Sequence, residues 1–450
     1  MNKIFDLNRK YDALIYLFET NYPKYHNLKY SGFQKNISSL QKILNKKTAL
    51  LSYFYADTSI VIFYITHKEY KLKAIPVDDK YFDIIRRFRA NISNVEILQN
   101  AYANNDNTII TEYIEDANKL YQILFPEEIR KEIKKGVFSH IEHLLIIPDG
   151  ELSTIPFEAF LAEKYQANWT GWNNKAYFSE MPYLVKYYNI SYSYSANLFY
   201  ETQPKTKDNP EFRNINDWLA LAPVFDNENI SGTNLRTRNL IQKNFKNTNT
   251  RAWLSNGSYI TPLPGSEKET KDIFKIFEEN NKKAELKTRK FANEEFVKSG
   301  ALKNYRFLHI ATHGMVNEEK PELSCILLAQ DTSGTEDNIL YSGEIYNLEL
   351  NADLTVLSAC ETGLGKIAEG EGIIGLTRAL LYAGSKNIVV SLWQVSDEST
   401  SKLMVDFYKN ILENEKSGFA EHLSKAKRKL ISEGKFAHPF FWSPFVLIGR

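Results

Sequence analysis

Short apolar runs that stop at polar or glycine-containing loops recur along the chain. Such runs are typical of the buried strands of a parallel sheet. Segments with helical spacing of apolar residues separate them, for example KETKDIFKIFEEN and TSKLMVDFYKNILEN. This alternation predicts right-handed crossovers and a mainly parallel sheet flanked by helices on both faces, an α/β fold. The runs are HLLIIPDG (143–150), DWLALAPVF (217–225), YRFLHIATHG (305–314), LTVLSAC (354–360) and NIVVSLW (387–393).

The chain before residue 143 follows other patterns. Residues 1–45 look helical, with interruptions at Pro23 and around Gly32. Residues 49–76 are rich in β-branched and aromatic side chains, which predicts a meander of strands. Residues 78–136 return to helical spacing of apolar positions.

A polar stretch at 202–214, with two prolines and several charged residues, favours a boundary between two halves. A chain of 450 residues is also longer than one core usually supports. We therefore expect an N-terminal helical segment (1–45), a first α/β half (46–210) and a second α/β half (211–450).

Composition excludes several classes of protein. The formal net charge is +1, from 56 basic and 55 acidic residues, which argues against a dedicated nucleic-acid binder. The two cysteines, Cys325 and Cys360, rule out a disulfide scaffold and favour a reducing cytoplasm. The sequence predicts neither a signal peptide nor a membrane span, so we expect a soluble cytoplasmic protein without direct contact to nucleic acid or membrane.

Two strand ends carry side chains suited to chemistry. The run LHIATHG ends in His313 and Gly314, and LSAC ends in Cys360, followed by Glu361. The histidine and the cysteine are 47 residues apart, enough for one or two crossover connections. Two neighbouring parallel strands would present both side chains at the same edge of the sheet, where functional groups of such folds collect.

This pair suits nucleophilic catalysis. A free thiol is only a few per cent thiolate at about neutral pH, and a nearby imidazole increases that fraction. The same imidazole can protonate the leaving amine. The backbone N–H groups of Gly314 and Cys360 are candidate donors to the oxyanion, and Gly314 lets a substrate carbonyl approach closely because it has no Cβ.

Structural roles are the alternatives for each of these residues. A cysteine at the end of an apolar strand is often a buried small hydrophobe, and we assign that role to Cys325 in LSCILLA. For Cys360 the polar residues that follow favour a strand exit. His309 and His313 are four apart, but a strand lacks the helical geometry of a zinc motif. We therefore expect neither a metal nor a cofactor.

The motifs resemble those of the CHAT domain family, bacterial caspase-like cysteine proteases related to separase. The resemblance rests on four segments in order: LHIATHG, LTVLSACETG, GEGIIGLTRALLYAGSKNIVVSLWQVSDEST and HPFFWSPFVLIG. The upstream segments HLLIIPDGELSTIPFEAFL and LPGSEKE are also similar to that family. The resemblance covers roughly residues 20 to 450.

The resemblance implies a caspase-like endopeptidase with His313 as base and Cys360 as nucleophile. It also implies a tandem architecture, in which the half at 46–210 is a degenerate pseudo-caspase and the half at 211–450 is the active one. CHAT domains often follow tetratricopeptide repeats, of which residues 1–45 hold at most a remnant. The chain is thus either a short member or a piece of a longer protein.

Three further residues are candidates for substrate binding. Asp397 resembles an aspartate that selects a basic residue before the cut in separase-like proteins, and the alternative is that it caps the helix beginning near Glu398. Trp393 either walls a substrate pocket or is a buried core aromatic. Glu361 either lines the cleft or faces solvent.

The resemblance further implies a protein or peptide substrate and an enzyme that stays latent until a protein partner or processing activates it. It points to antiviral defence or programmed cell death in bacteria, with a gasdermin-like pore former as one example of a substrate. The alternative function is a catalytically inactive scaffold that binds protein partners.

Overall fold

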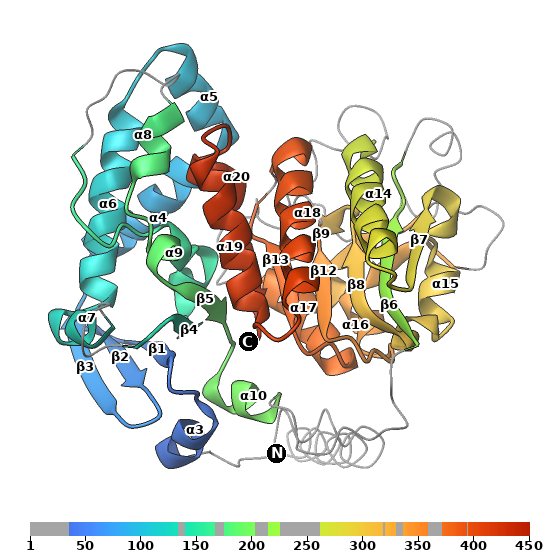
Figure 1. Cartoon of the computed structure of the whole chain (residues 1–450). Helices are drawn as coiled ribbons and strands as arrows, with labels where there is room; N and C mark the ends of the chain where they lie inside the picture. Colours follow the sequence, from blue (N-terminus) through green and yellow to red (C-terminus); the bar gives the residue numbers. More distant parts are fainter. Residues whose placement is uncertain are drawn as a thin grey trace, which may run out of the picture.

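The computed structural model describes residues 36–133, 140–166, 175–202, 215–225, 262–317, 320–329, 336–358, 371–393 and 395–450. Within these residues the strands form one large sheet of 11 strands and a small sheet of three. Helices pack on the large sheet (Figure 1). The predicted α/β fold, with a mainly parallel sheet flanked by helices, is confirmed.

The strands of residues 46–210 occupy one end of the large sheet, in the order β3-β2-β1-β4-β5. The predicted meander is present as three antiparallel strands, and β4 and β5 extend it in parallel. Their bounds are β1 (Thr48–Ala56), β2 (Ser59–Ile65), β3 (Tyr70–Pro76), β4 (His143–Ile147) and β5 (Asn189–Tyr192).

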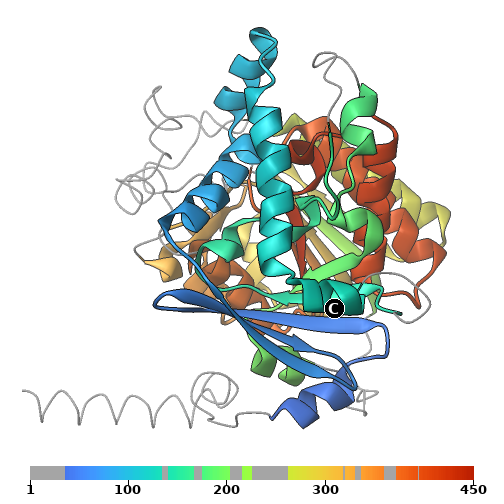
Figure 2. The same ribbon diagram turned by 90° about the vertical axis from the view of Figure 1, so that its left-hand side faces the viewer.

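Helices cover both faces of this end of the sheet. Helices α4 and α6 pack on one face, and the short helices α3 and α10 lie against part of the other (Figure 2). Of the N-terminal helical segment predicted at 1–45, only α3 falls among the described residues. The helices of this half are α3 (Ile37–Ile43), α4 (Asp79–Ser93), α5 (Val95–Ala103), α6 (Thr108–Leu124), α7 (Glu127–Ile133), α8 (Lys175–Glu180), α9 (Leu184–Tyr187) and α10 (Ala196–Glu201).

The strands after residue 211 form the other end, in the order β14-β13-β12-β8-β6-β7. All neighbours here are parallel except β14, which is antiparallel to β13. The bounds are β6 (Asn216–Ala222), β7 (Ala284–Thr288), β8 (Tyr305–Ile310), β12 (Leu354–Leu357), β13 (Ile388–Ser391) and β14 (Phe445–Ile448). The small sheet consists of β9 (Gly314–Met315), β10 (Cys325–Leu327) and β11 (Ile339–Tyr341).

Alternate residues of the central strand β8 face two helical layers. Phe307 contacts Phe277 and Phe419 on the layer of α14, α18 and α19, which lies in front of the sheet in Figure 1. Leu308 faces the other layer, among Leu376 and other apolar side chains of α15, α16 and α17. Both layers bury their apolar faces and so cover the strand completely. The helices are α14 (Pro264–Glu279), α15 (Glu294–Lys298), α16 (Ser342–Ile345), α17 (Glu371–Ala383), α18 (Asp397–Glu413), α19 (Phe419–Ser432) and α20 (Pro439–Trp442).

The two ends of the sheet join at one paired position, where Tyr192 of β5 lies beside Ile448 of β14. The Gly449 N–H donates to the Tyr192 carbonyl over 2.9 Å. Helix α19 reinforces this seam, because its Arg428 side chain donates to the Val185 carbonyl and to Asn189. The first block takes its strands from residues before the predicted boundary at 202–214, and the second block takes its strands from residues after it. That they are separate pseudo-caspase and active units stays a prediction.

Candidate active site

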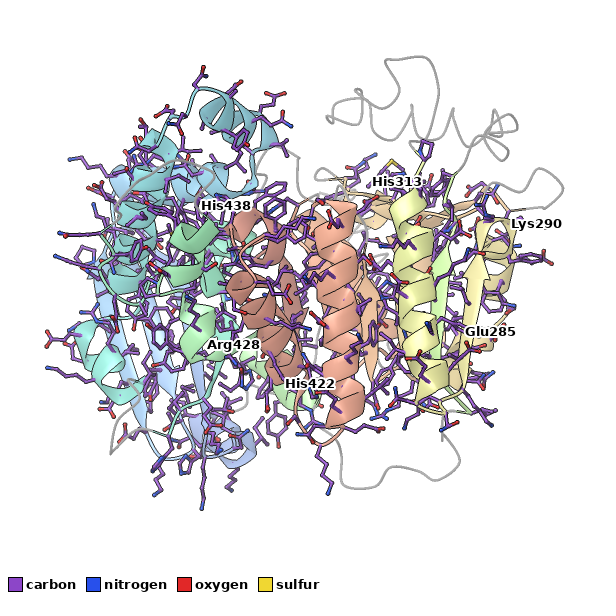
Figure 3. The ribbon with its side chains drawn as sticks, turned by 45° about the horizontal axis from the view of Figure 1, so that its top comes forward. Glu285, Lys290, His313, His422, Arg428 and His438 are labelled. Carbon is purple, nitrogen blue, oxygen red and sulfur yellow. The ribbon has the colours of Figure 1, made fainter. Side chains whose placement is uncertain are left out.

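His313 lies at the carboxyl edge of the second block of strands. Strand β8 ends at Ile310. The next residue is still hydrogen-bonded to the neighbouring strand, because the Ala311 N–H donates to the Leu221 carbonyl of β6. The Thr312 hydroxyl donates to the Leu327 carbonyl of β10. Figure 3 shows His313 beyond the strand end, near one end of α14. Hydrogen bonds from two strands therefore fix the backbone that carries the imidazole.

A turn with unusual backbone geometry packs an aromatic ring on His313. Val224 and Phe225 follow β6 with φ of 69° and 54°, in the left-handed region that a β-branched residue rarely occupies. The Leu263 N–H donates to the Val224 carbonyl and holds this turn. The Phe225 ring lies 5.2 Å from the imidazole, centroid to centroid, and His313 is 1% exposed. Such strain is concentrated at functional sites in proteins, where it fixes a side chain in place.

Gly314 opens the edge strand of the small sheet. The Leu327 N–H donates to the His313 carbonyl over 2.9 Å, so these two residues form a hydrogen-bonded pair of the antiparallel ladder. Gly314 lies opposite Ile326 at the next position. Because the ladder alternates, the N–H of Gly314 points away from β10, toward the open side of the small sheet.

The strand that leads to Cys360 is the direct neighbour of β8. β12 pairs with β8 in parallel, with Leu357 beside Ile310, and the Ser358 N–H donates to the Ile310 carbonyl. The expected adjacency of the histidine and cysteine strands is thus present. Cys360 and Glu361 themselves lie outside the described residues, so their predicted roles stay predictions.

Asp397 is exposed and is the first residue of α18, whose cap residue is Ser396. The expectation that Asp397 caps its own helix is wrong, because Ser396 already occupies the cap position. Its carboxylate accepts the N–H of Gly265, in the first turn of α14. Partial burial and the charge of Glu269 raise the pKa of Asp397, and the bond from Gly265 opposes this rise.

Glycine is required at position 265 by this contact. A Cβ there would lie 2.1 Å from a carboxylate oxygen of Asp397. Gly265 is two residues beyond Leu263, which bonds the turn that holds Phe225 against His313. Asp397 is therefore linked to His313 through two intervening segments, the start of α14 and the turn that carries Phe225. In the sequence, the positions of Asp397 and His313 differ by 84.

Trp393 is 1% exposed, and its indole N–H donates to the Phe440 carbonyl over 3.1 Å. This placement is that of a core aromatic residue. A role as a pocket wall would require the indole to become accessible, and it stays a prediction.

His309 and Cys325 have structural surroundings. The His309 Nε2 lies 2.7 Å from Glu269, and its Nδ1 lies 3.3 Å from the Tyr408 hydroxyl, so both ring nitrogens have protein partners. Cys325 is fully buried, as expected, and burial raises the pKa of its thiol well above the ordinary value. No group of three metal-binding side chains occurs among the residues that the structure describes.

Sequence reasoning missed the contacts that support the site. Glu269 is buried on the apolar face of α14, four residues before Ile273. An acidic residue at such a position is a signal for a buried partner, here His309. The Val224–Phe225 turn left no comparable signal, because neither residue type favours a left-handed backbone.

The chain is 32% identical over 119 residues to human tetratricopeptide repeat protein 28 and 32% identical over 111 residues to its mouse counterpart. These stretches cover 26% and 25% of this chain but only 5% and 4% of those proteins. The chain thus spans a small fraction of the length of these relatives.

Two solved structures match most of the chain, both at low sequence identity. A structure of the Saccharomyces cerevisiae separase–securin complex matches with a TM-score of 0.47 and 12% identity, over 91% of this chain and 31% of that one. The Arg-specific cysteine proteinase gingipain R matches with a TM-score of 0.42 and 10% identity, over 83% of this chain and 75% of that one.

Among the described helices none has both the length and the apolar character to cross a bilayer.

The family is shown by the sequence itself. The CHAT domain model matches residues 115–450, well over half of the chain and including β8, β12 and the strands beside them. The chain therefore belongs to the CHAT domain family.

Proposed function

We propose that this protein is a cysteine endopeptidase in which His313 is the base and Cys360 the nucleophile. The observation that carries the proposal is the parallel pairing of β8 with β12, with Ile310 beside Leu357. His313 and Cys360 each follow their paired residue by three positions. Consecutive Cα atoms are about 3.8 Å apart, so Cys360 is tethered within about 8 Å of Ser358 at the same edge.

The chemistry would proceed by acyl transfer. His313 accepts the thiol proton of Cys360, and the thiolate attacks the carbonyl carbon of the scissile bond. The N–H groups of Gly314 and Cys360 would donate to the oxyanion that forms. The imidazolium then protonates the departing amine, and water hydrolyses the thioester with His313 again as base. Packing against Phe225 supports this role, because it limits the orientations that the imidazole can adopt.

We further propose that Asp397 selects a basic residue before the cut. It is exposed, and it is connected to His313 through Gly265 and the Phe225 turn. Asp397→Asn keeps the acceptor for the Gly265 N–H while removing the charge, so a loss of preference for lysine and arginine would be a charge effect. Glu398→Gln is the matched control, since Glu398 is the exposed carboxylate next along the same helix.

The proposed enzyme acts on a protein substrate and is latent until a protein partner or processing activates it. A bacterial immune or cell-death pathway, with a gasdermin-like protein as a substrate, is the setting that the CHAT family suggests. Activation by a partner predicts cleavage by purified protein only after a cellular extract is added, and no cleavage by Cys360→Ala under the same conditions.

A scaffold that binds protein partners is the second candidate. It is favoured by the similarity to tetratricopeptide repeat protein 28, whose name describes repeats and not an activity. A scaffold has no requirement for a reactive thiol, and this difference separates the two candidates.

The deciding experiment combines peptide cleavage with thiol reactivity. A proteome-derived peptide library is incubated with the protein and with Cys360→Ala, and new termini are read by mass spectrometry. In parallel, iodoacetamide labelling of Cys360 is measured against pH, with the buried Cys325 as internal control. A dyad predicts labelling of Cys360 below the ordinary thiol pKa of about 8.5, and loss of that labelling in His313→Ala. The incubations are repeated with the cellular extract added, because the proposed enzyme is latent without it. Ordinary thiol reactivity together with no Cys360-dependent cuts in either condition would support the scaffold instead.

A further inference from the structure

The outer face of the β1–β3 meander is apolar and open to solvent. Phe54 is 57% exposed, Leu72 53% and Tyr70 41%. The strand register aligns these side chains with others on the same face, since Phe54 lies opposite Val61 and Phe63 opposite Leu72. Contiguous exposed apolar surface of this kind marks an interaction site. We call it the meander face: Phe54, Val61, Phe63, Tyr70, Leu72 and Ala74.

The other face of the same strands is fully used. Tyr53 and Ile62 are buried in the main core against α4 and α6. The two lysines of β3, Lys71 and Lys73, point to this covered side, where they form ion pairs with Glu132 and Glu128 of α7. Charged side chains often protect an edge strand from association. On β3 they lie on the inner side and leave the meander face apolar.

Helix α3 already covers the continuation of the meander face. Leu50 and Ile65, on the same side of β1 and β2, are buried in one cluster with Leu40 of α3 and with Leu44, the residue that follows the helix. The Gln41 side chain donates to the Glu69 carbonyl at the turn that leads into β3. Helix α3, which begins after its cap residue Asn36, therefore packs on the same side of the sheet as the meander face, and the chain that precedes Asn36 is joined to that side.

We propose that residues 4–18 dock on the meander face. These residues lie outside the described part, but their sequence, IFDLNRKYDALIYLF, has apolar positions at helical spacing. The stripe consists of Ile4, Leu7, Tyr11, Leu14 and Phe18, and the charged residues Asp6, Arg9, Lys10 and Asp12 lie between its first four members. An amphipathic helix of this kind needs an apolar surface for its stripe.

The dimensions agree with this occupant. Fifteen helical residues span about 22 Å at 1.5 Å per residue. A seven-residue strand such as β3 spans about 23 Å. The 17 residues between Phe18 and Asn36 reach up to about 56 Å when extended, which is ample for the return to α3.

Thiol accessibility in the full chain tests the proposal. Leu72→Cys is introduced with Cys360→Ser, so that Cys325, which is buried, is the other thiol. The rate of alkylation at position 72 is compared between this variant and one that also carries Leu7→Asp and Leu14→Asp. Arg9→Asp is the matched control, since position 9 is on the opposite side of a helix from the stripe. Thermal melting of each variant verifies that the fold is intact.

Docking predicts that the Leu7→Asp/Leu14→Asp pair raises the alkylation rate about tenfold by releasing the segment, and that Arg9→Asp leaves it unchanged. Equal rates with and without the aspartates would overturn the proposal. Protection that grows with protein concentration, with a doubled mass in light scattering, would show a second copy on the meander face and would also overturn it.

Discussion

Lys427 of α19 lies where the two blocks of the sheet meet, and its ammonium is 2.8 Å from Glu158, a residue of the first half. Both side chains are 1% exposed. The Tyr192 hydroxyl donates to the second carboxylate oxygen of Glu158, and the Phe157 N–H donates to that hydroxyl. Burial lowers the pKa of Lys427, and the carboxylate of Glu158 opposes this effect. The pair is therefore a charged group that holds two halves together within the core.

Lys427→Met removes the ammonium but keeps the volume of the side chain, so Glu158 remains as a buried carboxylate with only Tyr192 to satisfy it. Breaking a buried pair in this way costs about 3–5 kcal/mol. Replacing both partners, in Lys427→Met/Glu158→Gln, leaves no net charge in the core and should recover most of that loss. The single variants Lys427→Met and Glu158→Gln and the double variant form a thermodynamic cycle. The coupling energy of this cycle measures the interaction between the two groups.

The assay is urea unfolding followed by tryptophan fluorescence, and its readout is the free energy of the transition in which the two halves separate or unfold together. We expect the double variant to be more stable than Lys427→Met alone. A loss below about 1 kcal/mol for Lys427→Met, or a double variant that loses as much as both singles together, would refute the argument that the charge is desolvated and paired.

Two further predictions concern single residues elsewhere in the fold. Burial lowers the pKa of His438 from 6.5 to about 3, and its Nδ1 accepts the Phe440 N–H, so the folded protein binds fewer protons than the unfolded chain in that window. The stability that this group contributes is present above pH 6.5 and is lost as the pH falls. Between roughly pH 6.5 and 4, the free energy of urea unfolding should therefore decrease by about 3 kcal/mol less in His438→Asn than in the parent protein. Gly384 has φ of 117°, and a Cβ there would lie 2.1 Å from the Leu350 carbonyl oxygen. Gly384→Ala should lower the free energy of unfolding by more than about 3 kcal/mol, measured by thermal unfolding. Gly300→Ala is the control, with an expected loss of about 1–2 kcal/mol, because φ is 79° there but no described atom lies within 4 Å of the added Cβ. Equal losses in the two variants would exclude the clash at position 384.

The strands and helices of the second half follow from the sequence because their patterns are local. The apolar runs at β6, β8, β12 and β13 and the helical spacing of α14 and α18 are complete within each segment. The strand β7, with sequence AELKT, has half-buried residues throughout and lacks an apolar run, so the sequence did not predict it. The small sheet likewise consists of strands of two or three residues, too short for a periodic signal.

For the candidate site, the sequence predicts which residues stand at strand ends but not what supports them. His313 and the strand of Cys360 are placed by the alternation of strands and helices. The contact of Asp397 with Gly265 and that of Phe225 with His313 depend on tertiary packing between distant segments. Nothing local in a single sequence encodes such pairs, so the sequence offered substrate selection or helix capping for Asp397 but not its contact with Gly265.

The single paired position between β5 and β14 also bears on the order of folding. Its partners, Tyr192 and Ile448, are more than 250 residues apart, and closing so long a loop is entropically costly and slow. Strands β1 to β5 and their helices come from one continuous stretch of chain and can assemble first. Until β14 arrives, the edges of β5 and β13 are both unpaired, and unpaired edges promote aggregation. The refolding yield should therefore fall as the protein concentration rises, even under conditions in which the finished sheet is stable.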